Sequence, residues 1–174
     1  GVTSIGEYAF SYCDSLTSIT IPESVTNIGI AAFIECSRLT SIKIPNSVTS
    51  IESSAFANCT SLTSVTIPDT VKEIYWDAFS GCKNLKSVTL PDTLTVIGTS
   101  VFRDCRSLAE IRLPAGLVSI GDTAFSGCSA LQGISIPDNV VSLGLMAFAN
   151  CTSIEKVTIP AGVTSIGGGV FANC

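Results

Sequence analysis

The sequence predicts an α/β repeat solenoid, and three residue types that recur at one spacing predict it. Cysteine, proline and phenylalanine each return every 23 residues along the 174-residue chain. The cysteines are Cys13, Cys36, Cys59, Cys82, Cys105, Cys128, Cys151 and Cys174. The prolines run from Pro22 to Pro160 and the phenylalanines from Phe10 to Phe171, without an insertion or a deletion. A fixed period of this length indicates a stack of identical supersecondary units.

The same period sets the domain organisation. We expect a single domain over residues 1–174, with a partial unit at 1–12. The repeat units begin at Cys13, Cys36, Cys59, Cys82, Cys105, Cys128 and Cys151. Because the array starts and ends within a unit, we expect the chain to be a piece of a longer one.

Each unit begins with a segment that favours a β-strand. Leu39, Ile42 and Ile44 form the pattern L-x-x-I-x-I, whose last part alternates as a half-buried strand does. Pro45 has no backbone donor for a ladder, so it ends the strand. We expect these strands to form a parallel β-sheet on one face of the solenoid.

The rest of the unit predicts a short strand and one helical turn. Val48 and Ile51 mark the short strand. Residues that cap helices then precede Phe56, and Asn58 favours a left-handed stop. The predicted fold is therefore about seven and a half units, with short strands and single helical turns opposite the sheet.

Eight side chains in each unit are predicted to point inward. In one unit they are Leu39, Ile42, Ile44, Val48, Ile51, Ala55, Phe56 and Cys59. Burial of one set gives roughly 10–20 kcal/mol, whereas ordering 23 backbone residues costs on the order of 1–2 kcal/mol each. A single unit therefore cannot fold alone, and the units must stack. In such a stack we expect the cysteines to be buried free thiols, with Cys13 and Cys174 the most exposed.

Composition narrows the function classes. Hydrophobic residues make up 46% of the chain, which suffices for a packed core. The net charge of -5 argues against nucleic acid as a partner, because phosphates need clustered Lys and Arg. No apolar stretch is long enough for this segment to insert into a membrane. No catalytic or metal-binding motif occurs, so we expect a non-enzymatic chain without a cofactor.

The unit also resembles a known family. The pattern C-x-S-L-x-S-I-x-I-P-x-x-V-x-x-I-G-x-x-A-F-x-x, carried by the unit from Cys59 to Phe79, is similar to the BspA-type (Treponema-type) leucine-rich repeat. The resemblance covers essentially the whole chain. It implies a surface or secreted protein of a host-associated microbe. It also implies adhesion to a host matrix or plasma protein, or to a surface glycan.

The outward positions of the predicted sheet are the candidate binding residues. Most of them are Ser or Thr, which suit an exposed sheet by propensity alone. The charged exceptions are Arg112, Lys86, Glu110, Lys43 and Lys156. We place a ligand site there, with Arg112 first, because arginine is favoured at binding hot spots.

A second basic group lies in two neighbouring units. Lys83, Arg103 and Arg106 could hold an anionic glycan or an acidic protein segment. Alternatively, they form a solvated patch whose charge is balanced by Asp104 and Glu110.

Tyr75 and Trp76 replace the small residues found at their positions in most other units. Exposed aromatic residues can mark a partner contact, although isolated apolar residues on a surface are ordinary. We therefore list this pair as a possible aromatic contact.

Two alternatives to an adhesin-like module remain open. One is a structural spacer or stalk within a large surface protein. A remote one is a carbohydrate-active solenoid enzyme that uses Asp69 and Asp92, which we expect about 5 Å apart in adjacent proline turns, a separation typical of retaining glycosidases. Among partners, a second copy of the chain is also possible, through edge-to-edge self-association of unpaired strands.

Overall fold

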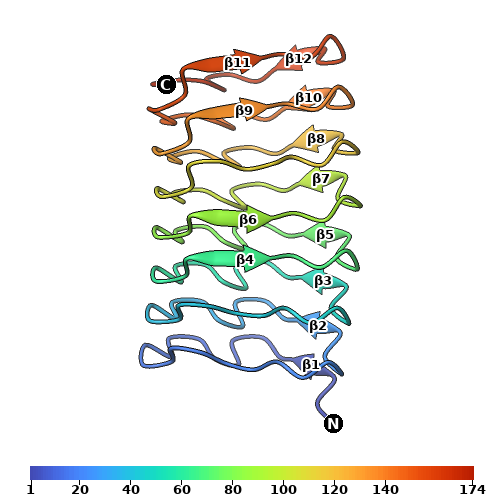
Figure 1. Cartoon of the computed structure of the whole chain (residues 1–174), viewed down its shortest axis with the longest axis vertical. Helices are drawn as coiled ribbons and strands as arrows, with labels where there is room; N and C mark the ends of the chain where they lie inside the picture. The colour runs from blue at the N-terminus through green and yellow to red at the C-terminus, as the bar shows by residue number, and fades with distance from the viewer.

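The computed structural model describes residues 1–174 as a stack of similar coils, ordered along the chain from one end of the molecule to the other (Figure 1). All strand pairs are parallel, and partners are 23 residues apart, as in the pairing of Val65 with Val88. The prediction of a parallel solenoid with about seven turns is therefore confirmed. Each coil has a front strand segment, a proline turn, a back strand and a second turn segment.

The front face is the outward side of the first strand segment in each coil. Its strands are β4 (Ser64–Thr66), β6 (Ser87–Thr89), β9 (Gly133–Ser135) and β11 (Lys156–Thr158). β4 pairs with β6 and β9 with β11, and a single bridge joins Thr20 to Lys43. The coil at 105–127 has no front strand. The expected front sheet thus consists of separate pieces, because no strand pairing joins the coil of Lys43 to β4, β6 to the coil at 105–127, or that coil to β9.

The back face is built from two-residue strands, as the pattern around Ile51 predicts. They are β1 (Ser4–Ile5), β2 (Asn27–Ile28), β3 (Ser50–Ile51), β5 (Glu73–Ile74), β7 (Val96–Ile97), β8 (Ser119–Ile120), β10 (Ser142–Leu143) and β12 (Ser165–Ile166). They form two four-stranded sheets, in the orders β1-β2-β3-β5 and β7-β8-β10-β12. The back ladder is therefore interrupted between β5 and β7.

We call the turn segment that leads from each back strand to the next cysteine the turn edge. The predicted helical turn at this place is wrong, and with it the α component of the fold class, because the structure contains no helix. A helix would bond within its own segment, whereas here the amides of Phe56 and Asn58 donate to carbonyls of the next coil at 2.8 and 2.7 Å. Accordingly, the structure offers no helix of membrane-crossing length.

Two residues in each coil of the turn edge have left-handed backbone angles. The first set is Tyr8, Ala31, Ser54, Asp77, Ser100, Thr123, Met146 and Gly169. The second set is Tyr12, Glu35, Asn58, Gly81, Asp104, Gly127, Asn150 and Asn173. The second set includes the predicted stop positions. The signal for a left-handed residue was thus right even though the segment before it is a chain of turns.

The core lies between the front and back strands and contains the inward side chains that the sequence predicts. All eight of the unit from Leu39 to Cys59 are buried. The phenylalanine rings from Phe10 to Phe171 form one stacked column with centroids 5.0 to 5.8 Å apart. Offset stacking of this kind adds about 0.5–1.5 kcal/mol per pair to the burial of the rings.

Candidate binding surfaces

Three of the five charged residues predicted on the sheet face lie in two adjacent coils of the front face. Lys86 directly precedes β6, and Glu110 and Arg112 follow in the next coil. The guanidinium of Arg112 lies 3.8 Å from the carboxylate of Asp92, and the two side chains are 84% and 79% exposed. An exposed pair of this kind contributes only about 0–1 kcal/mol, so Arg112 can exchange Asp92 for the carboxylate of a partner. We call Lys86, Glu110 and Arg112 the front cluster.

The other two predicted residues lie outside the front cluster. Lys43 donates to the carboxylate of Glu23 at 2.9 Å on the exposed surface. Lys156 lies in β11, five coils away from Lys43, which corresponds to about 24 Å at roughly 4.8 Å per strand. A single small epitope cannot include both lysines.

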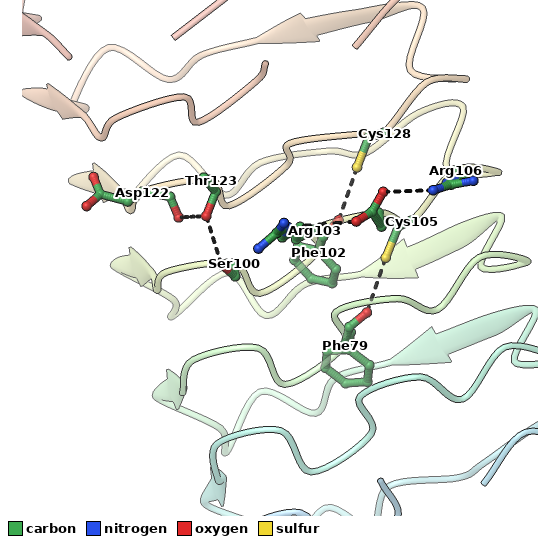
Figure 2. Close-up of polar contacts among 10 residues, drawn as sticks. Phe79, Ser100, Phe102, Arg103, Cys105, Arg106, Asp122, Thr123 and Cys128 are labelled. Carbon is green, nitrogen blue, oxygen red and sulfur yellow. Dashed lines mark hydrogen bonds and ion pairs between the residues drawn. The ribbon is translucent and has the colours of Figure 1, made fainter. Parts of the chain in front are cut away.

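The second basic group lies on the turn edge and shares one carboxylate. The oxygens of Asp104 lie 3.7 Å from Nε of Arg103 and 3.4 Å from Nη2 of Arg106, and Figure 2 draws both arginines at this place. Lys83 lies beside them, because its carbonyl accepts the amide of Ser107 at 3.1 Å. The two arginines therefore do not present two free positive charges.

The aspartates of the enzyme alternative occupy exposed turns. Asp92 faces Arg112, and the backbone carbonyl of Asp69 accepts the hydroxyl of Thr93 at 3.1 Å. The turn position after proline is one that aspartate favours for local reasons.

The cysteines form a column beside the phenylalanines, and each thiol except that of Cys13 donates a hydrogen bond. The acceptor is the carbonyl of the phenylalanine 26 residues earlier, with Sγ–O distances between 3.0 and 3.3 Å. Figure 2 shows two examples, from Cys105 to Phe79 and from Cys128 to Phe102. Six thiols are buried, whereas Cys13 is half-buried and Cys174 exposed, as expected.

Burial keeps these thiols protonated. Desolvation raises the pKa of Cys82 to about 12 and that of Cys36 to about 11, and it raises the pKa of Cys105 and Cys128 well above the ordinary value. A protonated thiol is a weak nucleophile and a weak metal ligand. The column is therefore a structural element.

A concave feature lies on the back face, between β5 and β7. It is a recess of about 510 Å³, lined among others by Tyr75, Trp76 and Val96. The Tyr75 hydroxyl donates to Glu73 at 2.5 Å, and this hydrogen bond raises the pKa of Tyr75. The structure thus places the predicted aromatic pair at an opening in the back ladder. We call this feature the back recess.

Comparison with protein families identifies the repeat. A family model described as a BspA type leucine-rich repeat region matches residues 1–107 and 72–174, which together span the whole chain. The chain belongs to the BspA-type leucine-rich repeat family.

Solved structures of other bacterial leucine-rich repeat proteins resemble this BspA-type chain. A T. pallidum leucine-rich repeat protein is 34% identical with a TM-score of 0.82, and the match covers 89% of this chain and 72% of that one. A leucine-rich cell surface protein from Faecalibacterium prausnitzii is 35% identical with a TM-score of 0.69, over 90% of this chain and 51% of that one. A protein from Bacteroides ovatus is 32% identical with a TM-score of 0.60, over 99% and 57%. The match thus spans only about half the length of the Faecalibacterium prausnitzii and Bacteroides ovatus proteins. The comparison with curated proteins found no match.

Two features of this BspA-type chain escaped the sequence analysis. The thiol hydrogen bonds were missed because the cysteines were taken only as small hydrophobic residues. Val96, Lys72 and Thr95 were missed as neighbours of the aromatic pair. A signal for Val96 was available, since most other coils have a serine at its position.

Proposed function

We propose that this chain is a non-enzymatic binding module of an adhesin-like protein at the cell surface or secreted from the cell, and that its front face binds a partner. One observation carries the proposal: the coils repeat their buried side chains almost without change, while several exposed front positions depart from the prevailing Ser and Thr, as at Lys86, Glu110 and Arg112. An invariant core under a variable surface is what a repeat scaffold for recognition requires.

The front cluster is the part of that surface with the strongest means of recognition. Lys86 is exposed and has no carboxylate within ion-pair distance, and Arg112 has only an exposed and loosely held one. A carboxylate-bearing segment of a host matrix or plasma protein fits these two cations, because arginine binds carboxylates through two parallel hydrogen bonds. Glu110 between them selects against uniformly acidic partners.

The test is binding of the immobilised chain to a panel of matrix and plasma proteins, measured by biolayer interferometry. The double variant Lys86→Ala, Arg112→Ala is expected to weaken a saturable interaction by about tenfold or more, as the loss of one hot spot does. The matched control is Lys43→Ala, Lys156→Ala, which removes the same charge elsewhere on the front face. Equal weakening in both variants, or no saturable binding to any protein of the panel, would contradict the proposal.

A structural spacer is the second candidate, and the front threonines favour it. The hydroxyls of Thr40 and Thr63 donate to carbonyls of the preceding coil at 3.2 and 3.3 Å. Side chains that are already engaged in holding coils together are less available to a partner. If the folded chain binds no protein of the panel, that result would favour a spacer.

A further inference from the structure

On the back face, two backbone hydrogen bonds that join all other pairs of neighbouring coils are missing at one interval. Between all other neighbouring coils, an amide before each back strand and an amide after it donate to the preceding coil, as Thr49 does to Thr26 and Glu52 to Ile28 at 3.0 and 3.1 Å. Across the interval between β5 and β7, the equivalent amides of Thr95 and Gly98 make no hydrogen bond. Two exposed or half-exposed donors are therefore left open at this interval.

The sequence departs from its own repeat at the same interval. Tyr75 stands where most coils have glycine, Trp76 where most have a small or polar residue, and Val96 where most have serine. Their side chains are 36%, 64% and 46% exposed. Three apolar replacements at one opening of the ladder form a single surface feature.

Gly98 lies next to the indole ring of Trp76. A methyl group at Gly98 would lie 3.6 Å from Cδ1 of Trp76, so the ring lies next to bare backbone. The back recess thus combines an exposed indole ring with backbone whose two amides are open.

One negatively charged and one positively charged side chain lie beside the aromatic residues of the back recess. Glu73 accepts the hydroxyl of Tyr75 and keeps its second oxygen free, while Lys72 has no carboxylate within ion-pair distance. Thr95 of the next coil also lines the recess. The charges of Lys72 and Glu73 cancel, so the recess favours a ligand that is neutral.

We infer that the back recess is a carbohydrate-binding site, in which a neutral hexopyranose unit of a glycan stacks on Trp76. The C–H bonds on one face of a pyranose carry partial positive charge, which the face of an indole ring attracts. The hydroxyls at the rim of the sugar both donate and accept, as the groups of Glu73, Lys72 and the open amide of Thr95 require. The volume of the recess, about 510 Å³, is typical of a site for a small ligand.

Other occupants fit less well. An added peptide strand would need about 4.8 Å on each side, and the facing Cα atoms of β5 and β7 lie within 8 Å of each other. A nucleic acid needs clustered cations, and the recess has one lysine beside one glutamate. This site lies on the face opposite the front cluster, so it is independent of the proposed front-face function.

The single tryptophan of the chain provides the test, since Trp76 is the only such residue. Its emission is followed under selective excitation while the intact chain is titrated with linear hexasaccharides of glucose, mannose, galactose or N-acetylglucosamine. At least one of these sugars is expected to change the emission saturably below about 10 mM, since a Kd of about 1 mM corresponds to roughly -4.1 kcal/mol. No saturable change with any of the four would overturn the inference.

Calorimetric titrations of variants distinguish sugar binding at this site from nonspecific binding. Trp76→Ala is expected to weaken sugar binding about tenfold or more, Trp76→Phe less, and Glu73→Gln several-fold. The matched control is Leu145→Ala, which truncates an exposed apolar side chain at the same repeat position three coils later. Binding that survives Trp76→Ala, or that falls equally in Leu145→Ala, would contradict the assignment. The variant Lys86→Ala, Arg112→Ala is expected to bind the sugar normally, which keeps this test distinct from that of the front face.

Discussion

The turn edge and the two strand faces differ in how strictly they repeat. The turn edge makes the same three amide-to-carbonyl bonds across each of the seven intervals between coils, as from Ser54, Phe56 and Asn58 to the next coil. The strand faces repeat less strictly. The back face lacks two bonds between β5 and β7, and the front face has strand pairing only between β4 and β6, between β9 and β11 and at the bridge of Thr20 to Lys43. The strand pairing on the two faces is therefore less regular than the hydrogen bonding of the turn edge.

The difference has a physical cause. The turn edge rests on the phenylalanine column and on the thiol hydrogen bonds, so a change there disturbs two buried columns at once. The strand faces direct every second side chain to solvent, where substitutions cost little. The turn edge therefore maintains the stack, and the faces are free to acquire binding residues.

The largest expected effect is the loss of stability at alkaline pH, which tests the cysteine column. The folded-state pKa of buried thiols such as Cys82 and Cys151 is raised to about 12, whereas an unfolded thiol has a pKa of about 8.5. Their contribution is complete below about pH 8.5 and is lost as pH rises toward the folded-state pKa, at up to about 1.4 kcal/mol per thiol per pH unit. Urea unfolding between pH 7 and 10.5 measures it.

The control for this titration is the double variant Cys105→Ala, Cys128→Ala. It is expected to be less stable at pH 7 but to lose stability less steeply with rising pH, because two fewer thiols titrate. An unchanged slope would contradict the assignment of the pH dependence to the column.

The next largest effect is the loss of stability when a ring of the phenylalanine column is removed, which we compare at two positions. Phe102 is stacked at 5.8 and 5.5 Å from its neighbours, and Phe56 at 5.2 and 5.3 Å. If the turn edge is uniform, Phe102→Ala and Phe56→Ala each lower the free energy of unfolding by about 3–5 kcal/mol. Chemical denaturation measures both. A cost at Phe102 less than half of that at Phe56 would mean that the interruption reaches the turn edge as well.

A smaller effect is expected at Gly81 on the turn edge. Gly81 has a φ of 72°, and a methyl group there would overlap the side-chain oxygen of Asn58. Gly81→Ala is expected to cost about 1–3 kcal/mol, the usual range for a strained left-handed residue. Gly133→Ala on the front face is the control, because its methyl group would meet only ordinary contacts. Thermal unfolding of the two variants that gives equal shifts would contradict the contrast between edge and face.

The smallest effect is expected for exposed side chains of the front face. Thr89→Ala in β6 removes an outward side chain whose backbone carbonyl keeps its bond to the amide of Ile67. The free energy of unfolding is expected to change by no more than about 0.5 kcal/mol. A loss above about 1 kcal/mol in denaturant unfolding would show that the front strands stabilise the stack as strongly as the turn edge.

The sequence predicted the features that follow from the 23-residue period and from the pattern of apolar and polar residues within it. The inward positions and the proline turn follow from residue types that recur from coil to coil, and the left-handed residue at Asn58 follows from the Asn, Asp or Gly found there in most coils. The helical turn was wrong because capping residues and a left-handed stop also suit a chain of turns, and the bonds that decide between them run to the next coil.

The binding surfaces were predictable only in part. The charged departures from Ser and Thr identified the front cluster as candidates, but the sequence could not separate it from Lys43 and Lys156 in space. The back recess depends on two backbone bonds that are not made between neighbouring coils, and no single residue type predicts their loss. Only the coincidence of Tyr75, Trp76 and Val96 hinted at it.

The interruption of the back ladder also has a mechanical consequence. A rod anchored at one end and bound at the other carries tension along its axis, and each interval between coils transmits the whole load. Across the interval between β5 and β7, the back face lacks two backbone bonds, whereas the front face has the β4–β6 ladder and the turn edge keeps its three bonds. Under tension, this interval is therefore expected to open on the back face first, while the front strands and the turn edge still hold the two coils together.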